Sequence, residues 1–160
     1  MIKKLDKKIL FIILTFVLLV LVSAYVIEYI LGYQPCKLCI YERIPYFVSV
    51  LLILSLFFLK KNTKFILITL SLIFLGGAAL SFYHFGIEQG FFEESIVCTN
   101  VDTKSTLTKE ELLETLKNNT ISCKEVNFRI LGFSLATINI ILSLILSAIF
   151  AKLFINYEKN

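Results

Sequence analysis

Residues 65–85 read FILITLSLIFLGGAALSFYHF, a run that contains no aspartate, glutamate, lysine or arginine. An α-helix needs about 20 mainly apolar residues to cross the hydrocarbon core of a bilayer, within a range of about 17–25. The run is long and apolar enough to meet this requirement. It therefore predicts a membrane-spanning helix.

Three further segments share this apolar character: residues 9–32, 44–59 and 133–154. The segment at 44–59 is short for a span unless its helix begins near Leu38, which would put Glu42 and Arg43 at the membrane interface. The sequence therefore predicts an all-α membrane protein of one domain, residues 1–160, folded as a four-transmembrane-helix bundle.

The composition supports a membrane protein over a soluble one. Hydrophobic residues make up 58% of the chain, against about 45–50% in soluble domains. The mean hydropathy is +0.83. The net charge of +4 is small, and no basic stripe is interleaved with aromatic residues. We therefore expect a lipid bilayer as the surroundings and no nucleic-acid partner.

The charged residues in the connections and near the ends of the four spans favour one orientation. Four spans place both termini on the same side, together with the connection after residue 59. That side carries nine basic and two acidic residues, a net +7, whereas the other side carries a net −3. Because lysine-rich segments stay in the cytoplasm, we predict cytoplasmic termini and two extracytoplasmic loops, at about 33–43 and 86–129.

The N-terminal segment has a second interpretation. Its lysines, its apolar run and the small residues near Ala24 are typical of a cleavable signal peptide. The apolar run continues to Leu31, however, which is longer than a usual signal core. Cleavage would leave the cysteines on the same side of the membrane in either case.

All four cysteines lie outside the apolar runs, in the two extracytoplasmic loops. Cys36 and Cys39 form a C-x-x-C motif, and Cys98 and Cys123 lie in the second loop. On the oxidising side of a membrane disulfides form and persist, so two pairs predict a relay for thiol–disulfide exchange. The alternatives are static disulfides that brace the loops, or half of a zinc site. Structural zinc usually needs two closely spaced pairs, and Cys98 and Cys123 are 25 residues apart.

Charged and titratable residues near these loops suggest electron and proton transfer. A helix N-terminus favours a thiolate. Cys39 lies just before the second span, and on a continuous helix Arg43 would share its face. Such a thiolate could pass electrons to a lipid-soluble acceptor. The only histidine, His84, could move a proton there, although it could equally be a satisfied polar group. Glu28 is a further candidate near the same depth, or a carboxylate that simply reaches water.

The second loop also contains a helix signal. Thr108 and Glu111 fit a capping box, and Leu112, Leu113 and Leu116 follow at helical spacing. This pattern predicts a short amphipathic helix on the membrane surface, with an ordinary solvent-exposed helical turn as the alternative.

Taken together, these motifs resemble the family of disulfide bond formation protein B (DsbB), over nearly the whole chain. The resemblance rests on PCKLCIYER at residues 35–43, Tyr83-His84, Glu88-Gln89-Gly90, Cys98 and Cys123. It implies a thiol oxidase of the bacterial inner membrane. Such an enzyme reoxidises a soluble periplasmic DsbA-like thiol oxidase and passes the electrons to the membrane quinone pool, with ubiquinone or menaquinone as the acceptor.

The resemblance also implies a role for each cysteine. Cys98 would form the mixed disulfide with the soluble partner, and Cys123 would be its disulfide mate. Cys36 would link that pair to the Cys36–Cys39 disulfide, and Cys39 would be the thiolate facing the quinone.

The resemblance also implies roles for three residues other than the cysteines. Arg43 would assist the Cys39 thiolate, and His84 and Gln89 would lie near the quinone. The chain departs from the family pattern by having Glu28 where many members have glutamine and by lacking tryptophan. These departures leave the quinone preference open.

Two other classes of protein have four spans and extracytoplasmic cysteines. In proteins like vitamin K epoxide reductase the C-x-x-C follows the loop cysteines, whereas here it precedes them. A structural, tetraspanin-like protein would use its disulfides only to brace the loops, but the Cys-Cys-Gly of that family is absent from the sequence.

Overall fold

The computed structural model describes residues 7–58, 62–94, 98, 122–124 and 128–158. The elements in these ranges are α1 (Lys7–Tyr25), the π-helix η1 (Val26–Ile30), α2 (Lys37–Tyr41), α3 (Ile44–Phe58), α4 (Thr63–Glu88), β1 (Arg129–Ile130), β2 (Phe133–Ser134) and α6 (Leu135–Glu158). The predicted amphipathic helix around residues 108–116 lies outside the described residues.

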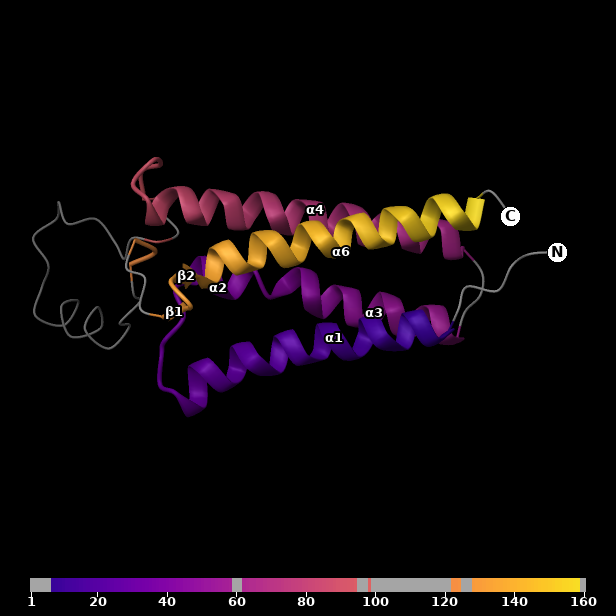
Figure 1. Ribbon diagram of the computed structural model, residues 1–160, viewed down its shortest axis with the longest axis horizontal. Helices are drawn as coiled ribbons and strands as arrows, with labels where there is room; N and C mark the ends of the chain where they lie inside the picture. The colour runs from indigo at the N-terminus through magenta and orange to yellow at the C-terminus, as the bar shows by residue number, and fades with distance from the viewer. Residues whose placement is uncertain (1–6, 59–61, 95–97, 99–121, 125–127, 159–160) are drawn as a thin grey trace, which may run out of the picture.

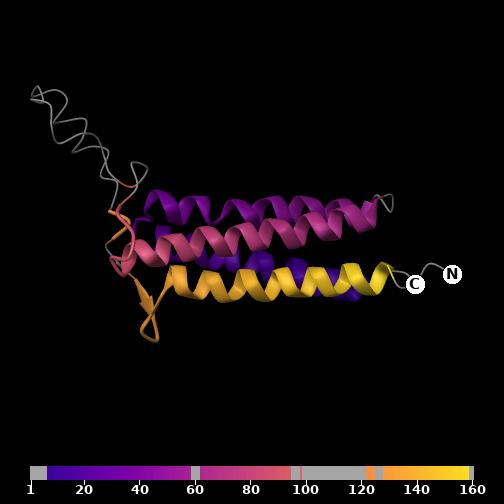
Figure 2. The ribbon, with the colours of Figure 1, turned by 90° about the horizontal axis from the view of Figure 1, so that it is seen from above.

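The long helices run back and forth along one common axis (Figures 1 and 2). The start of α1 and the end of α6 lie at one end of the bundle, and α2, β1, β2 and the end of α4 lie at the other (Figure 1). We call the latter the α2 end. Four helical stretches are long and apolar enough to cross a membrane: Lys7–Ile30, Lys37–Phe58, Thr63–Glu88 and Leu135–Tyr157. The prediction of a four-helix membrane fold is confirmed.

A break in the helix explains the short segment at 44–59. The backbone N–H of Glu42 donates to the carbonyl of Leu38 at 2.9 Å, but that of Arg43 donates to Ile40, only three residues back, at 3.1 Å. This tighter turn separates α2 from α3, and Pro45 follows in the first turn of α3, where its missing N–H costs little. Together α2 and α3 form the helical stretch Lys37–Phe58, which begins before the apolar run and is long enough to cross a membrane.

Aromatic and small side chains hold the helices together. Phe74 on α4 packs edge-on against Tyr46 of α3 and stacks on Phe150 of α6, with ring centroids 5.4 and 5.8 Å apart. Gly77 lets α4 approach α3, because a Cβ there would lie 3.2 Å from Cγ of Pro45. Small residues allow such close contacts between spans. Many of the remaining large apolar side chains are exposed, as expected for a surface that faces lipid.

The α2 end is closed by a hairpin and a folded-back segment. β1 and β2 pair antiparallel, with Arg129 opposite Ser134, and project beyond the bundle at the start of α6 (Figure 2). After α4 the chain turns back, and the backbone N–H of Phe91 donates to the carbonyl of Gly86 at 2.8 Å. Cys98 and Cys123 of the second loop pack here against Leu38 of α2 and Ile87 of α4.

Candidate functional site

The two cysteine pairs lie together at the α2 end. Cys36 of the C-x-x-C motif shares one buried cluster with Cys98, Cys123 and Ile87, and Cys39 packs against that cluster. We call Cys36 and Cys39 the inner pair and Cys98 and Cys123 the loop pair. Residues that are up to 87 positions apart in the sequence are therefore neighbours in space.

The two pairs differ in their bonding. The loop pair is a disulfide, with its sulfurs 2.07 Å apart. The carboxylate of Glu94 holds this segment by accepting a hydrogen bond from the backbone N–H of Cys123 at 2.8 Å. The inner pair consists of free thiols, with the sulfurs 2.8 Å apart. The site thus combines a closed disulfide with an adjacent dithiol.

Cys36 occupies the N-terminal cap of α2. Its sulfur accepts a hydrogen bond from the backbone N–H of Cys39 at 3.2 Å. Hydrogen bonds from the Cys39 thiol and from His84 lower the pKa of Cys36 to about 5, although burial opposes this shift. The sequence favoured Cys39 as the thiolate at the helix start. The helix starts earlier than the apolar run, so Cys36 has that position and Cys39 lies one turn inside.

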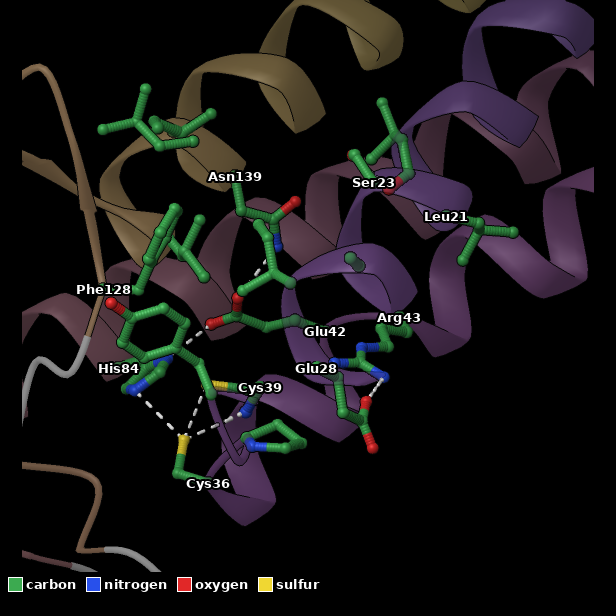
Figure 3. Close-up of a pocket in the computed structure, with 18 of the residues that line it drawn as sticks. Leu21, Ser23, Glu28, Cys36, Cys39, Glu42, Arg43, His84, Phe128 and Asn139 are labelled. Atoms are coloured by element: carbon green, nitrogen blue, oxygen red, sulfur yellow. Dashed lines mark hydrogen bonds and ion pairs between the residues drawn. The ribbon is translucent and has the colours of Figure 1, made fainter. Parts of the chain in front are cut away.

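A chain of buried polar groups leads from Cys36 into the bundle (Figure 3). The Cys36 sulfur lies 3.5 Å from Nε2 of His84, and Nδ1 of His84 lies 2.8 Å from Oε1 of Glu42. The other carboxylate oxygen of Glu42 accepts a hydrogen bond from the Asn139 amide at 3.0 Å. The Asn139 carbonyl in turn accepts one from the hydroxyl of Tyr46.

Glu42 and Asn139 were not among the residues predicted for the site. Both had a signal in the sequence. Glu42 belongs to the PCKLCIYER motif, and Asn139 is a polar residue within an apolar span, where such residues are functional candidates. Their partners His84 and Ser81 are 42 and 58 residues away along the chain, so only the folded bundle brings these groups together.

Arg43 faces α1 and η1 rather than Cys39. Its guanidinium donates to the carboxylate of Glu28 in η1 and lies 5.0 Å above the ring of Tyr25. The spacing of four residues from Cys39 indicates a shared face only on a continuous helix, and the break between α2 and α3 falls between these two residues. Arg43 and Cys39 nevertheless line the same cavity.

This cavity has a volume of about 230 Å³ and contacts both residues of the inner pair. Its walls are largely apolar, with polar groups at the α2 end (Figure 3). Glu28, Arg43 and His84 are among the lining residues. Gln89 is exposed at the C-terminal cap of α4 and does not line the cavity, whereas the preceding residue, Glu88, does.

The donor atoms of this site suit a quinone better than a metal ion. Cys36, Cys39 and His84 lie close enough to be considered as zinc ligands. Two thiolates on one tetrahedral zinc ion would be about 3.7 Å apart, given Zn–S bonds of about 2.3 Å, and the inner sulfurs are closer at 2.8 Å. An apolar cavity with a few polar groups, by contrast, matches a flat ring that carries two carbonyl oxygens.

Comparisons with known proteins identify the family to which this chain is similar. Residues 6–153 match the model of a family described as disulfide bond formation protein DsbB. The chain is also similar to the uncharacterized protein RP370 of Rickettsia prowazekii (strain Madrid E). The two are 32% identical over 151 residues, which cover 93% of this chain and 87% of that relative. No solved structure matches the chain.

Proposed function

This chain belongs to the DsbB family of membrane disulfide-bond formation oxidases, and from that membership we propose a specific reaction for it. The protein oxidises the dithiol of a soluble DsbA-like thiol oxidase and transfers the two electrons through its two cysteine pairs to a membrane quinone. The products are the partner's disulfide and a quinol. The protein thereby sustains disulfide formation in other proteins.

The reaction uses the cysteines in a fixed order. A thiolate of the reduced partner attacks Cys98, which forms a mixed disulfide and releases Cys123. Attack by Cys123 on Cys36 then opens the inner disulfide and frees Cys39. The partner's second thiol resolves the mixed disulfide and releases Cys98. Cys98 then attacks Cys123, which closes the loop disulfide again and releases Cys36, so the inner pair ends as the dithiol. Each exchange breaks one S–S bond and forms another, so no further oxidant is needed until the inner pair is reduced.

The observation that carries this proposal is the shared buried cluster of Cys36, Cys98 and Cys123. Disulfide exchange requires the attacking sulfur to reach the disulfide directly. A protein that used its disulfides only to brace two loops would not need the two pairs to be in contact. It would also not need the inner pair to line a cavity.

The cavity beside the inner pair fits the second half-reaction. A bound quinone would supply a two-electron acceptor that takes up two protons. Cys39 would face it as the electron donor, Arg43 would contact a polar oxygen of the ring, and His84 would lie near it. The apolar residues of α1 and α6 would hold its ring. Ubiquinone and menaquinone both satisfy these requirements.

The proposed orientation places the α2 end in the periplasm and both termini in the cytoplasm. The loop pair is then on the same side of the membrane as a periplasmic partner, and the cavity lies level with the outer part of the inner membrane. Lysine-rich connections at the opposite end support this orientation through the positive-inside rule.

Single-turnover quinone reduction separates the two halves of the reaction. We expect chemically reduced protein that carries Cys98→Ser and Cys123→Ser to reduce one quinone per chain, because the inner pair is intact. Reduced Cys39→Ser protein should reduce none. With a reduced partner protein as the electron donor, both variants should lose turnover.

The same samples provide the control and the opposing outcome. Before reduction, the Cys39→Ser protein should still elute as a folded species with its loop disulfide closed, as checked by mass spectrometry after alkylation. Quinone reduction at the wild-type rate by Cys39→Ser protein would show that the inner pair is not the donor.

A further inference from the structure

The buried chain of polar groups beyond Cys36 has no part in the electron path. It contains a carboxylate and an imidazole that are almost fully buried, with Glu42 6% and His84 3% exposed. Burial of such groups is costly unless every partner is present. Here the Glu42 carboxylate receives hydrogen bonds on both oxygens, from His84 and from Asn139. The buried Glu42–His84 pair beside the inner pair therefore calls for a functional explanation.

The hydrogen bonds fix which nitrogen of His84 carries its proton. A carboxylate can only accept hydrogen bonds, so the proton shared with Glu42 resides on Nδ1. Nε2, 3.5 Å from the sulfur of Cys36, can then accept the thiol proton and hydrogen-bond the resulting thiolate. A base that is oriented by a carboxylate on its other nitrogen is the arrangement that activates a nucleophile in many enzymes.

The amide of Asn139, which is itself bonded to two hydroxyls, holds the carboxylate in place. Asn139 on α6 donates to Glu42 and also to the hydroxyl of Ser81 on α4, at 2.7 Å. Its carbonyl accepts from Tyr46 on α3. Three membrane-spanning helices thereby fix the position of Glu42, and the geometry at His84 depends on the packing of the bundle.

One other carboxylate faces His84. Oε1 of Glu88, one turn further along α4, lies 3.8 Å from Nε2, beyond hydrogen-bond distance. Its Oε2 is buried without a hydrogen-bond partner among the described residues. Among the residues that the structure describes, the charged and titratable groups around the histidine are Cys36, Cys39, Glu42 and Glu88, and of the two carboxylates only Glu42 is hydrogen-bonded to it.

We propose that Glu42 and Asn139 are positioning residues that orient His84 as the base for Cys36 when the inner pair closes to a disulfide. This inference rests on the proposed function and extends it to the proton. His84 takes the thiol proton of Cys36 at Nε2, and the Cys36 sulfur attacks the Cys39 sulfur. The S–S bond forms as the electron pair leaves Cys39 for the quinone.

The protons balance across this step. The dithiol loses two protons and two electrons, and the quinone gains the same numbers to become a quinol. One of the protons passes through His84, which returns it to the cavity, so the histidine is unchanged after each turnover. Glu42 keeps its hydrogen bond to Nδ1 and stabilises the imidazolium while it exists.

The alkylation rate of Cys36 as a function of pH tests this inference without any quinone. In Cys39→Ser protein with the loop disulfide closed, Cys36 is the only free thiol, and serine still offers a hydroxyl to the Cys36 sulfur. Iodoacetamide labelling, followed by mass spectrometry from pH 4 to 10, gives the midpoint of Cys36 ionisation. We expect this midpoint to lie below that of an ordinary cysteine, which is about 8.5.

Substitutions in this background should move the midpoint in a defined way. His84→Gln and Glu42→Gln should each raise it by about one pH unit, which is about a tenfold loss of thiolate at a pH below both midpoints. Asn139→Ala should raise it by a smaller amount. Glu93→Gln removes an exposed carboxylate outside the network and should leave the profile unchanged.

The outcomes separate this inference from the proposed function. If His84→Gln moves the midpoint but Glu42→Gln and Asn139→Ala do not, the positioning role is refuted. If none of the three moves it, His84 is not the base. In both cases a Cys39-dependent reduction of quinone would leave the proposed function standing. Should Glu42→Gln fail to fold, Asn139→Ala supplies the same readout.

Discussion

At the residue scale, the ion pair between Arg43 and Glu28 determines how much positive charge and hydrogen-bonding capacity the cavity presents to a ligand. The two side chains are largely buried, at 15% and 19% exposed, and the stacked contact with Tyr25 adds a cation–π interaction. A quinone oxygen must therefore compete with Glu28 for the guanidinium of Arg43. The negative charge of Glu28 lowers the net charge that Arg43 presents to the cavity.

Because of this competition, substitutions of Arg43 and Glu28 should change the KM for quinone in opposite directions. Arg43→Ala should raise the apparent KM for quinone about tenfold, because a hydrogen bond to a charged group contributes about 1.5–3 kcal/mol. Glu28→Gln should lower that KM, because it frees the guanidinium. Arg129→Ala, which removes an exposed arginine on β1, serves as the control. Steady-state titration with a soluble quinone analogue measures all three, and an unchanged KM in Arg43→Ala would remove Arg43 from the site.

At the scale of single elements, the end of α4 shows how local packing supports the site. Tyr83 of α4 stacks on Phe92 of the folded-back segment, with ring centroids 5.6 Å apart. Phe92 in turn covers Gly86, where a Cβ would lie 2.1 Å from Cδ2 of the ring. Only glycine allows the segment to fold back at this point. His84 lies between these two residues in the chain, so this packing also fixes the helix turn that carries it.

Two alanine substitutions in α4 should therefore have opposite effects on stability. Gly86→Ala displaces the Phe92 ring, and overpacking of this kind costs about 1–3 kcal/mol. Gly76→Ala meets no atom within 4 Å, and alanine favours a helix over glycine by up to about 1 kcal/mol. Melting temperatures in detergent should fall for Gly86→Ala and rise slightly for Gly76→Ala. Equal melting temperatures would contradict the close approach of Phe92.

The elements also show how far the sequence alone could predict this molecule. The four spans could be predicted, because lipid requires long apolar runs whatever their partners are. The break between α2 and α3 was not predicted, although Pro45 is a signal for it, because a proline has no N–H to bond the carbonyl four residues back, here that of Tyr41. Without the break, the spacing from Cys39 to Arg43 indicated a shared face that the structure does not have. The contacts of His84 with Cys36 and Glu42 depend on packing between distant segments, which periodicity does not encode.

At the scale of the whole molecule, the structure separates two ends with different chemistry. Both cysteine pairs, the cavity and the buried polar network are at the α2 end, and α1 starts and α6 ends at the opposite end (Figure 1). In the proposed reaction, electrons enter from the soluble partner at the loop pair and leave through the cavity to a quinone in the lipid. This arrangement works only if the α2 end faces the compartment in which the partner is located.

Reporter fusions test this orientation. We expect a green fluorescent protein joined after Asn160 to fluoresce and an alkaline phosphatase at the same point to be inactive, because both would be in the cytoplasm. A phosphatase inserted between Lys104 and Ser105 should be active in the periplasm. Phosphatase activity at the C-terminus would reverse the assigned topology.

Coupled turnover of the intact protein is the most direct test of the quinone-linked relay. Purified wild-type protein in detergent is mixed with a reduced periplasmic dithiol oxidase and with ubiquinone or menaquinone, and quinone absorbance and partner thiols are followed together. The account predicts one quinol formed for each partner disulfide, with at least one of the two quinones. Folded protein with both cysteine pairs intact that transfers no electrons to either quinone would contradict it and favour a structural role for the disulfides.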